Sequence, residues 1–491
     1  MKLFKWICPL VLCAAMLAPQ AMAADYTYDH WGDSIPAPVS YALTNMVTGQ
    51  STGTVPFDAP KDIFVGRDAI YVADSGNNRI VVLDLSYRFL YEITTVTGCE
   101  DGIETLNEPA GIFVDNEGVI YICDTANERV LKVDKTGKCL LTLKKPENDL
   151  LDEHLRFTPV KVVASGIGDI FVVAEGIYMG FVRYNAKGDF LGFFGTNRVE
   201  VTADVLARSL WKKFFTEEQN QASVQFLPIE YSNAFIDSDG MIYAVVKRST
   251  TSLDEVKKLN AKGQNVLRFV NEGKLYPQND FGDVEKEYVR GVLQDNWFVS
   301  VDVTDDGLMV LLDANKGHVF VYNANSELMF VFGSRGIGNA VFSNPADVAH
   351  NGSDLLIVDS DAGDIKIFSP TIYTQKVIEA LSFDSEHYEQ AAAVWQQVLK
   401  YNSNSALAYR GLGKARMQQG DYTGAMAYFK LANAKRDYSD VFRAYRKQQL
   451  EKYAVFLVIG AVALIVALRF ALRLFKKWLG YSVTARKVRF K

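Results

Sequence analysis

The sequence predicts a multi-domain chain with an all-β propeller of six blades, a small all-α helical-repeat region and one transmembrane helix. Three observations carry this prediction. A four-strand unit recurs six times up to residue 370, the apolar period then changes from two to about 3.6 residues, and a long apolar run follows. The domain bounds that follow are 1–23 for a signal peptide, 24–370 for the propeller, 371–452 for the helical repeats, 453–475 for the span and 476–491 for a basic tail.

The first 23 residues have the features of a secretory signal. Lys2 and Lys5 precede an apolar stretch, and Ala21-Met22-Ala23 forms a small-x-small cleavage site. An uncleaved N-terminal anchor is the alternative. The apolar stretch is shorter than the ~20 residues that a span needs, which favours cleavage.

Residues 453–475 have the length of a single membrane span. At ~1.5 Å per residue this run crosses the ~30 Å of hydrocarbon in a bilayer. Eight Lys or Arg residues lie between Arg469 and Lys491, with no Asp or Glu among them. The positive-inside bias therefore predicts a single-pass cell-membrane protein, with a cytoplasmic tail and the N-terminal domain outside the cell.

The charge of the exported part limits its possible partners, and its cysteine count limits its disulfides. The chain has 52 basic and 58 acidic residues, and ten of the basic ones lie in the signal, span and tail, which leaves about −16 outside. This acidic surface argues against nucleic acid as a partner. Cys99, Cys123 and Cys139 remain after cleavage, so at most one disulfide forms within the chain.

The repeated unit is clearest in its first two copies. Pro60-Lys-Asp-Ile-Phe-Val and Pro109-Ala-Gly-Ile-Phe-Val each begin a unit, and each second strand ends in Asp, at Asp74 and Asp124. Later copies begin near Pro159, Asn233, Ser300 and Pro345. One four-stranded blade cannot bury both of its faces, so repeated blades pack around an axis as a propeller.

The segment Val72-Ala-Asp-Ser-Gly-Asn-Asn-Arg-Ile80 resembles the core of an NHL repeat, and weaker versions begin at Asp124 and Asp359. The resemblance covers about residues 60–370 and implies a six-bladed NHL-like propeller, a fold that serves mainly as a binder and less often as an enzyme. Blade six lacks a fourth strand of its own before Pro370. We expect residues 39–47 to supply that strand and close the ring.

Recurring Asp residues after the second strands raise a metal hypothesis. Asp74, Asp124, Asp313 and Asp359 share one position, but blade three has Ala174 there. Asp after a strand commonly accepts backbone N–H bonds in a turn. The structural interpretation is therefore favoured over a metal site, and Arg79 and Arg129 are expected to form ion pairs between blades.

Two irregular insertions, 196–232 and 271–297, are longer than typical loops. Both follow an outer strand, so they emerge on the same rim of the ring. Their aromatic residues form a candidate rim that binds a partner, peptide or carbohydrate; the alternative is that they bury themselves as a cap. The candidate residues are Trp211, Phe214, Tyr276, Phe281 and Tyr288.

The segment from Ala408 to Ala432 resembles a tetratricopeptide repeat (TPR), and 373–402 resembles a preceding copy with Glu379 where Gly is usual. The resemblance assigns its small and large packing positions to Leu412, Gly413, Ala425, Phe429 and Ala432. Two repeats form a short solenoid. We interpret it as a spacer with a docking surface.

Little in the sequence indicates catalysis. The five His residues form no metal-binding pattern, and no nucleophile motif stands in a suitable context. We predict no enzyme activity, no cofactor and no metal. The favoured function is an extracellular, membrane-anchored scaffold for other membrane or envelope proteins; the alternatives are a metal-dependent propeller hydrolase or lyase and an extracellular ligand sensor.

Overall fold

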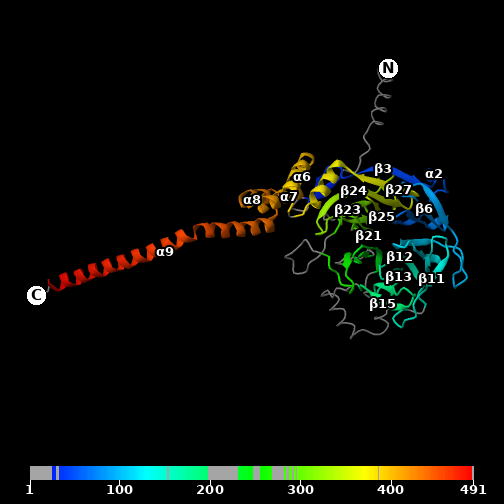
Figure 1. Cartoon of the computed structure of the whole chain (residues 1–491), viewed down its shortest axis with the longest axis horizontal. Helices are drawn as coiled ribbons and strands as arrows, with labels where there is room; N and C mark the ends of the chain where they lie inside the picture. The colour runs from blue at the N-terminus through cyan, green and yellow to red at the C-terminus, as the bar shows by residue number, and fades with distance from the viewer. Residues whose placement is uncertain are drawn as a thin grey trace, which may run out of the picture. The chain divides into compact units, whose positions relative to one another are not determined.

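The structure is a computed structural model that describes residues 25–28, 33–151, 154–196, 230–246, 255–267, 281–283, 287–289, 292–294, 296–384 and 386–488. The chain divides into two compact units between Gln375 and Lys376. The signal segment 1–23 and residues 197–229 of the first insertion lie outside the described residues. Figure 1 shows the propeller in blue to yellow and the helical unit in yellow to red.

The first unit is the predicted six-bladed propeller. Each blade is an antiparallel sheet of consecutive strands, with the innermost strand first in sequence. The first three blades consist of β4 (Pro60–Val65), β5 (Ile70–Asp74), β6 (Arg79–Leu83) and β7 (Phe89–Ile93); β8 (Pro109–Val114), β9 (Ile120–Asp124), β10 (Arg129–Val133) and β11 (Cys139–Leu143); and β12 (Thr158–Ala164), β13 (Ile170–Glu175), β14 (Phe181–Tyr184) and β15 (Phe190–Phe194).

The remaining blades differ at their outer edges. Among the described residues, blade four has three strands, and a separate hairpin, β19–β20, precedes blade five. An N-terminal hairpin, β1–β2, extends blade five through a Tyr26–Val331 pair. The bounds are β16 (Tyr231–Ile236), β17 (Ile242–Val246) and β18 (Val256–Leu259); β19 (Glu287–Val289) and β20 (Val292–Gln294); and β21 (Phe298–Val303), β22 (Met309–Asp313), β23 (His318–Tyr322), β24 (Leu328–Phe332), β1 (Tyr26–Tyr28) and β2 (Ser34–Pro36).

Blade six joins the two ends of the ring. It consists of β25 (Pro345–Asn351), β26 (Asp354–Asp359), β27 (Asp364–Pro370) and, at its outer edge, β3 (Tyr41–Thr48). β3 pairs antiparallel with β27, from Asp364 opposite Thr48 to Pro370 opposite Tyr41. The short helix α2 (Gly49–Thr52) then leads the chain into blade one. The last blade is therefore built from both ends of the propeller sequence.

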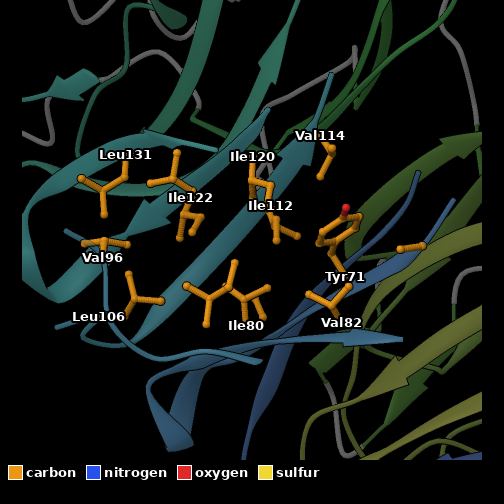
Figure 2. Packing of buried hydrophobic residues seen from close by; sticks show 14 residues of the cluster. Tyr71, Ile80, Val82, Val96, Leu106, Ile112, Val114, Ile120, Ile122 and Leu131 are labelled. Carbon is orange, nitrogen blue, oxygen red and sulfur yellow. The ribbon is translucent and has the colours of Figure 1, made fainter. Parts of the chain in front are cut away.

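Apolar side chains fill the space between successive blades. Figure 2 shows the cluster between blades one and two, where Ile80 and Val82 of β6 face Ile112 of β8 and Ile122 of β9. Most of its members are fully buried. Burying one such side chain stabilises the fold by roughly 1.5–3 kcal/mol. A corresponding cluster joins blades six and one, so the ring is closed by side-chain packing as well as by β3.

The helical unit contains antiparallel neighbours and one long final helix. Ser405 caps α7 by accepting a hydrogen bond from Ala408 N, and Asp421 caps α8 by accepting one from Gly424 N. The end of the helical-repeat region expected at 371–452 and the span expected at 453–475 belong to one continuous helix, α9. The helices are α5 (Ile372–Ser382), α6 (Tyr388–Tyr401), α7 (Ala406–Gln418), α8 (Tyr422–Leu431) and α9 (Lys435–Val488).

α9 is the one candidate membrane span among the described residues. Its apolar section is long enough to cross a bilayer. Large apolar side chains from Tyr453 to Phe475 are exposed, as expected for a surface that faces lipid. In the part of the chain that the structure describes, α9 is therefore the helix whose length and composition suit a membrane anchor.

Candidate functional site

The six inner strands place one equivalent residue each around the propeller axis. In every inner strand the pairing with the second strand skips one residue at the start, for example between Pro60 and Asp62. Such a bulge turns the next side chain away from the regular pleat. The six residues that follow the bulge, here called the axial ring, are Asp62, Gly111, Lys161, Asn233, Ser300 and Asp347.

The axial ring holds a buried ion-pair network. Lys161 Nζ lies 2.5 Å from Asp62 Oδ1 and 3.7 Å from Asp347 Oδ2. Asn233 Nδ2 donates to Asp347 Oδ1 at 3.1 Å, and Ser300 Oγ donates to the same oxygen. All of these side chains are nearly inaccessible to solvent. One ammonium group thus connects carboxylates from blades one and six with blade three.

Backbone amides complete the network. Ile112 N donates to Asp62 Oδ2 at 2.5 Å, and Ile63 N donates to Asp347 Oδ2 at 2.9 Å. Each carboxylate therefore accepts a hydrogen bond from the next blade around the ring. Buried charges are tolerated only when they are paired and hydrogen-bonded in this way. The axial ring consequently links the inner strands of different blades to one another.

The two carboxyl groups of the axial ring differ in acidity. Burial raises the pKa of Asp62 well above its usual value, and the neighbouring Asp347 adds to the rise. At Asp347 burial acts in the same direction, but Lys161 and the hydrogen bonds from Asp62, Ser300 and Ile63 outweigh it and lower the pKa. Asp62 is therefore the weaker acid of the two.

Gly111 leaves the axial ring without a side chain in blade two. A Cβ atom at this position would lie 2.9 Å from Lys161 Cα and closer still to the carbonyl oxygen of Val160. Real Cβ atoms do not approach backbone so closely. Glycine is therefore required here because strands β8 and β12 approach each other, and this approach brings Lys161 to the axis.

A small cavity of about 40 Å³ lies beside the axial ring. Phe64, Phe113 and Phe235 line it together with Asp302 and His350. Its volume admits a few water molecules but no sugar ring. The cavity in its present shape is therefore too small for the substrates of most enzymes.

His350 is the one histidine on this cavity. Its Nδ1 lies 2.7 Å from Asp302 Oδ2, and its Nε2 lies 3.6 Å from Asp305 Oδ1. Burial opposes protonation of the ring, but the two carboxylates outweigh it and raise the pKa of His350 to about 9. His350 is therefore a cation at neutral pH and a poor general base.

The axial ring does not fit a bound divalent cation. Its oxygen donors suit a hard cation in type, but the Lys161 ammonium already lies between Asp62 and Asp347. A dication there would have to displace the ammonium from between the two carboxylates. In the part of the chain that the structure describes, no group of three or more His, Cys, Asp or Glu residues could hold a metal ion.

The recurring Asp residues after the second strands serve the turns. Asp74 accepts a hydrogen bond from Asp58 N at 2.8 Å, and Asp359 accepts bonds from the amides of Ser343 and Asn344. The structural interpretation of this repeated position is correct. The expected ion pairs also form, but the partner of Arg79 is Asp74 of the same blade rather than a neighbouring one.

Arg129 repeats this arrangement in blade two. It pairs with Asp124 at 2.8 Å within the blade and with Asp101, in the connection from blade one, at 2.8 Å. Blade six uses Lys366 in the same role, 2.8 Å from Asp359. In blades one, two and six these ion pairs fix the second strand to the third, so Arg79, Arg129 and Lys366 have structural roles.

The structure describes two of the five candidate rim residues. Phe281 is 5% exposed and packs against Tyr322 with ring centroids 5.0 Å apart. It belongs to the core between blades four and five, so its assignment to a binding rim is wrong. Tyr288 lies on β19 opposite Leu293 of β20. Trp211, Phe214 and Tyr276 lie outside the described residues.

The TPR packing positions lie between α7 and α8. Leu412, Gly413, Ala425 and Phe429 are buried. A Cβ atom at Gly413 would lie 2.6 Å from the ring of Phe429, so the glycine permits the close approach of the two helices. Ala432, at the C-cap of α8, is only partly buried.

The sequence analysis did not predict a second polar cluster, which lies around Asp283. The hairpin β1–β2 brings Tyr26 and Tyr28 to Asp283, and Tyr28 donates to Asp283 Oδ1 at 2.8 Å. Lys316 Nζ donates to Asp283 Oδ2 at 2.7 Å, and His318 Nδ1 lies 3.2 Å from it. The cluster fastens the N-terminal hairpin to blade five. The cluster could not be recognised in the sequence, because its members are single polar residues separated by up to about 290 positions.

The comparison with protein families agrees with the predicted helical repeats. A tetratricopeptide repeat family matches residues 382–440. The search among curated proteins found no match.

Among solved structures, the chain is similar to a virginiamycin B lyase from Staphylococcus aureus (9% identity, 67% of this chain and 99% of that one, TM-score 0.37). It is also similar to a gluconolactonase from Xanthomonas campestris (9%, 72% and 99%, TM-score 0.39). A third similar structure is a protein of unknown function from Bacteroides thetaiotaomicron (11%, 68% and 73%, TM-score 0.40). Likeness at this level decides nothing about activity.

The chain thus combines a six-bladed propeller with a helical unit that contains a tetratricopeptide repeat. The final helix of the helical unit is the candidate membrane span.

Proposed function

We propose that this protein is a membrane-anchored scaffold that presents its propeller and its TPR unit outside the cell to other membrane or envelope proteins. The observation that carries the proposal is the combination of two folds commonly used for protein binding with one anchoring helix. The Lys161 ion pairs add support, because they engage the carboxylates of the axial ring in contacts within the protein.

The proposed orientation rests on the ends of the chain. A signal-like sequence at 1–23 sends the N-terminal part out of the cell, and the basic residues that begin with Arg469 keep the C-terminal end inside. Protease added to intact cells should digest the propeller and spare an epitope placed after Lys491. Digestion of the epitope with survival of the propeller would contradict the orientation. Inverted vesicles provide the matched control and should give the opposite pattern.

Photo-crosslinking tests the scaffold role and identifies which unit carries the interface. A photoreactive amino acid is placed at Leu431 of α8, which is 63% exposed, or at Ile167 in a turn of blade three, which is 85% exposed. We expect an adduct with another membrane or envelope protein from at least one position. The variant Phe429→Ala provides a control, because it should disrupt the TPR core and abolish the Leu431 adduct alone. Adducts that contain only copies of this chain would contradict the proposal.

A further inference from the structure

Two of the three cysteines in the described residues lie on backbone segments that are hydrogen-bonded to each other. Cys99 lies in the connection between blades one and two, and Cys139 is the first residue of β11. Thr97 N donates to Gly137 O at 3.0 Å, and Cys139 N donates to Thr97 O at 2.8 Å. Thr97 and Lys138 form a parallel bridge. The connection therefore runs beside the outer strand of blade two where the two cysteines occur.

The side chains of these cysteines meet. Their thiol groups lie within hydrogen-bonding reach of each other, and both pack against the apolar cluster of Figure 2. Each cysteine lies within two residues of the Thr97–Lys138 bridge, where paired backbones are about 4.8 Å apart. A disulfide requires a Cα separation of roughly 4.4–6.8 Å, so this placement suits a bond between Cys99 and Cys139.

Cys123 is excluded as a partner. It lies on β9, is 0% exposed and belongs to the cluster between blades two and three, whereas Cys99 and Cys139 belong to the cluster between blades one and two. Burial also raises the pKa of its thiol well above the usual value, which makes it inert. Among the three cysteines, the geometry favours one pairing.

We propose that Cys99 and Cys139 are joined by a disulfide in the mature protein. The proposal rests on the extracellular placement under Proposed function, because disulfides persist in oxidising compartments. The two thiols lose two protons and two electrons as the S–S bond forms. A protein or low-molecular-weight disulfide accepts them and is reduced to two thiols. The bond fastens the connection between blades one and two to the outer edge of blade two.

The environment indicates when the bond forms. Burial and the neighbouring Cys139 raise the pKa of Cys99 to about 12, so the reactive thiolate is scarce in the folded protein. Oxidation is therefore expected during folding, before blade two packs against blade one. Both cysteines are only partly buried, so a reductant can reach the completed bond in the folded protein.

Mass spectrometry of the full-length protein tests the pairing. The chain is purified in detergent without reductant, its free thiols are alkylated in denaturant, and its peptides are mapped. We expect one linked peptide pair containing Cys99 and Cys139, and alkylated Cys123. The variant Cys123→Ala should keep the link and Cys139→Ser should lose it. Three alkylated thiols after refolding with oxidised glutathione, or a link to Cys123 or to a second copy, would overturn the proposal.

Comparing refolded protein with protein taken directly from cells separates the disulfide proposal from the proposed extracellular placement. If refolding with oxidised glutathione gives the link but protein taken directly from cells is fully reduced, the extracellular placement is wrong and the bond is absent in the mature protein. If the cell-derived propeller is digested by external protease yet both preparations lack the link, the location stands and the pairing is wrong. Thermal melting adds a second readout. The oxidised protein should melt roughly 5 °C higher than Cys139→Ser, and a strong reductant should remove that difference.

Discussion

Replacing Lys161 by Met tests whether the axial ion pairs hold the propeller together. Met keeps the length and most of the volume of the side chain, so the change removes the charge without opening a large cavity. Asp62 and Asp347 then face each other with no cation between them. At an effective dielectric constant of ~20, each lost attraction is about 4–7 kcal/mol. Partial protonation of Asp62 reduces the net cost, and loss of one partner from a buried pair typically costs about 3–5 kcal/mol.

The assay is urea denaturation of the full-length chain in detergent at pH 7, followed by circular dichroism. Lys161→Met should lower the free energy of unfolding by about 3–5 kcal/mol. The double variant Asp62→Asn/Lys161→Met should recover at least half of the loss, because it removes one of the two opposed charges. Lys144→Met is the matched control. Its side chain is 61% exposed and 3.8 Å from Asp101, so the expected change is about 0–1 kcal/mol.

The pH dependence gives a second test of the same reasoning. Without Lys161, the pKa of the opposed carboxyl groups in the folded state lies above the unfolded value, so stability falls as pH rises through that range. The deficit of Lys161→Met should therefore shrink between pH 7 and pH 5. A loss below about 1 kcal/mol at pH 7 would refute the ion-pair account. So would a double variant that is less stable than Lys161→Met alone.

Three further predictions concern single residues. The raised pKa of His350, about 9, should stabilise the fold below pH 6.5 by up to about 3 kcal/mol. This contribution is lost as pH rises to 9. His350→Gln should therefore flatten the pH dependence of the free energy of unfolding, measured by urea titration. Gly111→Ala should cost about 1–3 kcal/mol in the same assay, since its Cβ would clash with the β12 backbone; an unchanged midpoint would contradict the close approach. Phe429→Ala should destabilise the TPR unit by about 3–5 kcal/mol; limited proteolysis should then cleave between α7 and α8 while the propeller stays intact, and equal resistance to wild type would contradict the packing.

Much of the propeller could be predicted because each blade repeats a local pattern. Short strands with a turn after each second strand mark five of the six blades, and the incomplete blade six indicates that an earlier strand must complete it. β3 lies where that argument places it. The hairpin β1–β2 could not be found this way, because strands of three residues have no detectable period.

The axial ring was missed for a different reason. Its members differ in residue type, and no motif links Asp62 to Lys161 or Asp347. The members share a position in the inner strand but not a type of side chain. In blades one, three and six this position is the second residue after a Pro near the start of the inner strand. An alignment of the repeats by that Pro would have shown a charged residue in each of these three blades. The burial of Phe281 could not be foreseen because its neighbours in sequence are polar.

The pairing of β3 with β27 has a consequence for how the protein is made. Thr44 and Ser369, which are hydrogen-bonded across this pair, are 325 residues apart. During synthesis the first of these residues leaves the ribosome long before its partner has been made. β3 therefore stays without its partner strand until nearly the whole ring has emerged. An unpaired strand can bind chaperones or aggregate, so slowed translation should lengthen the period in which β3 can aggregate.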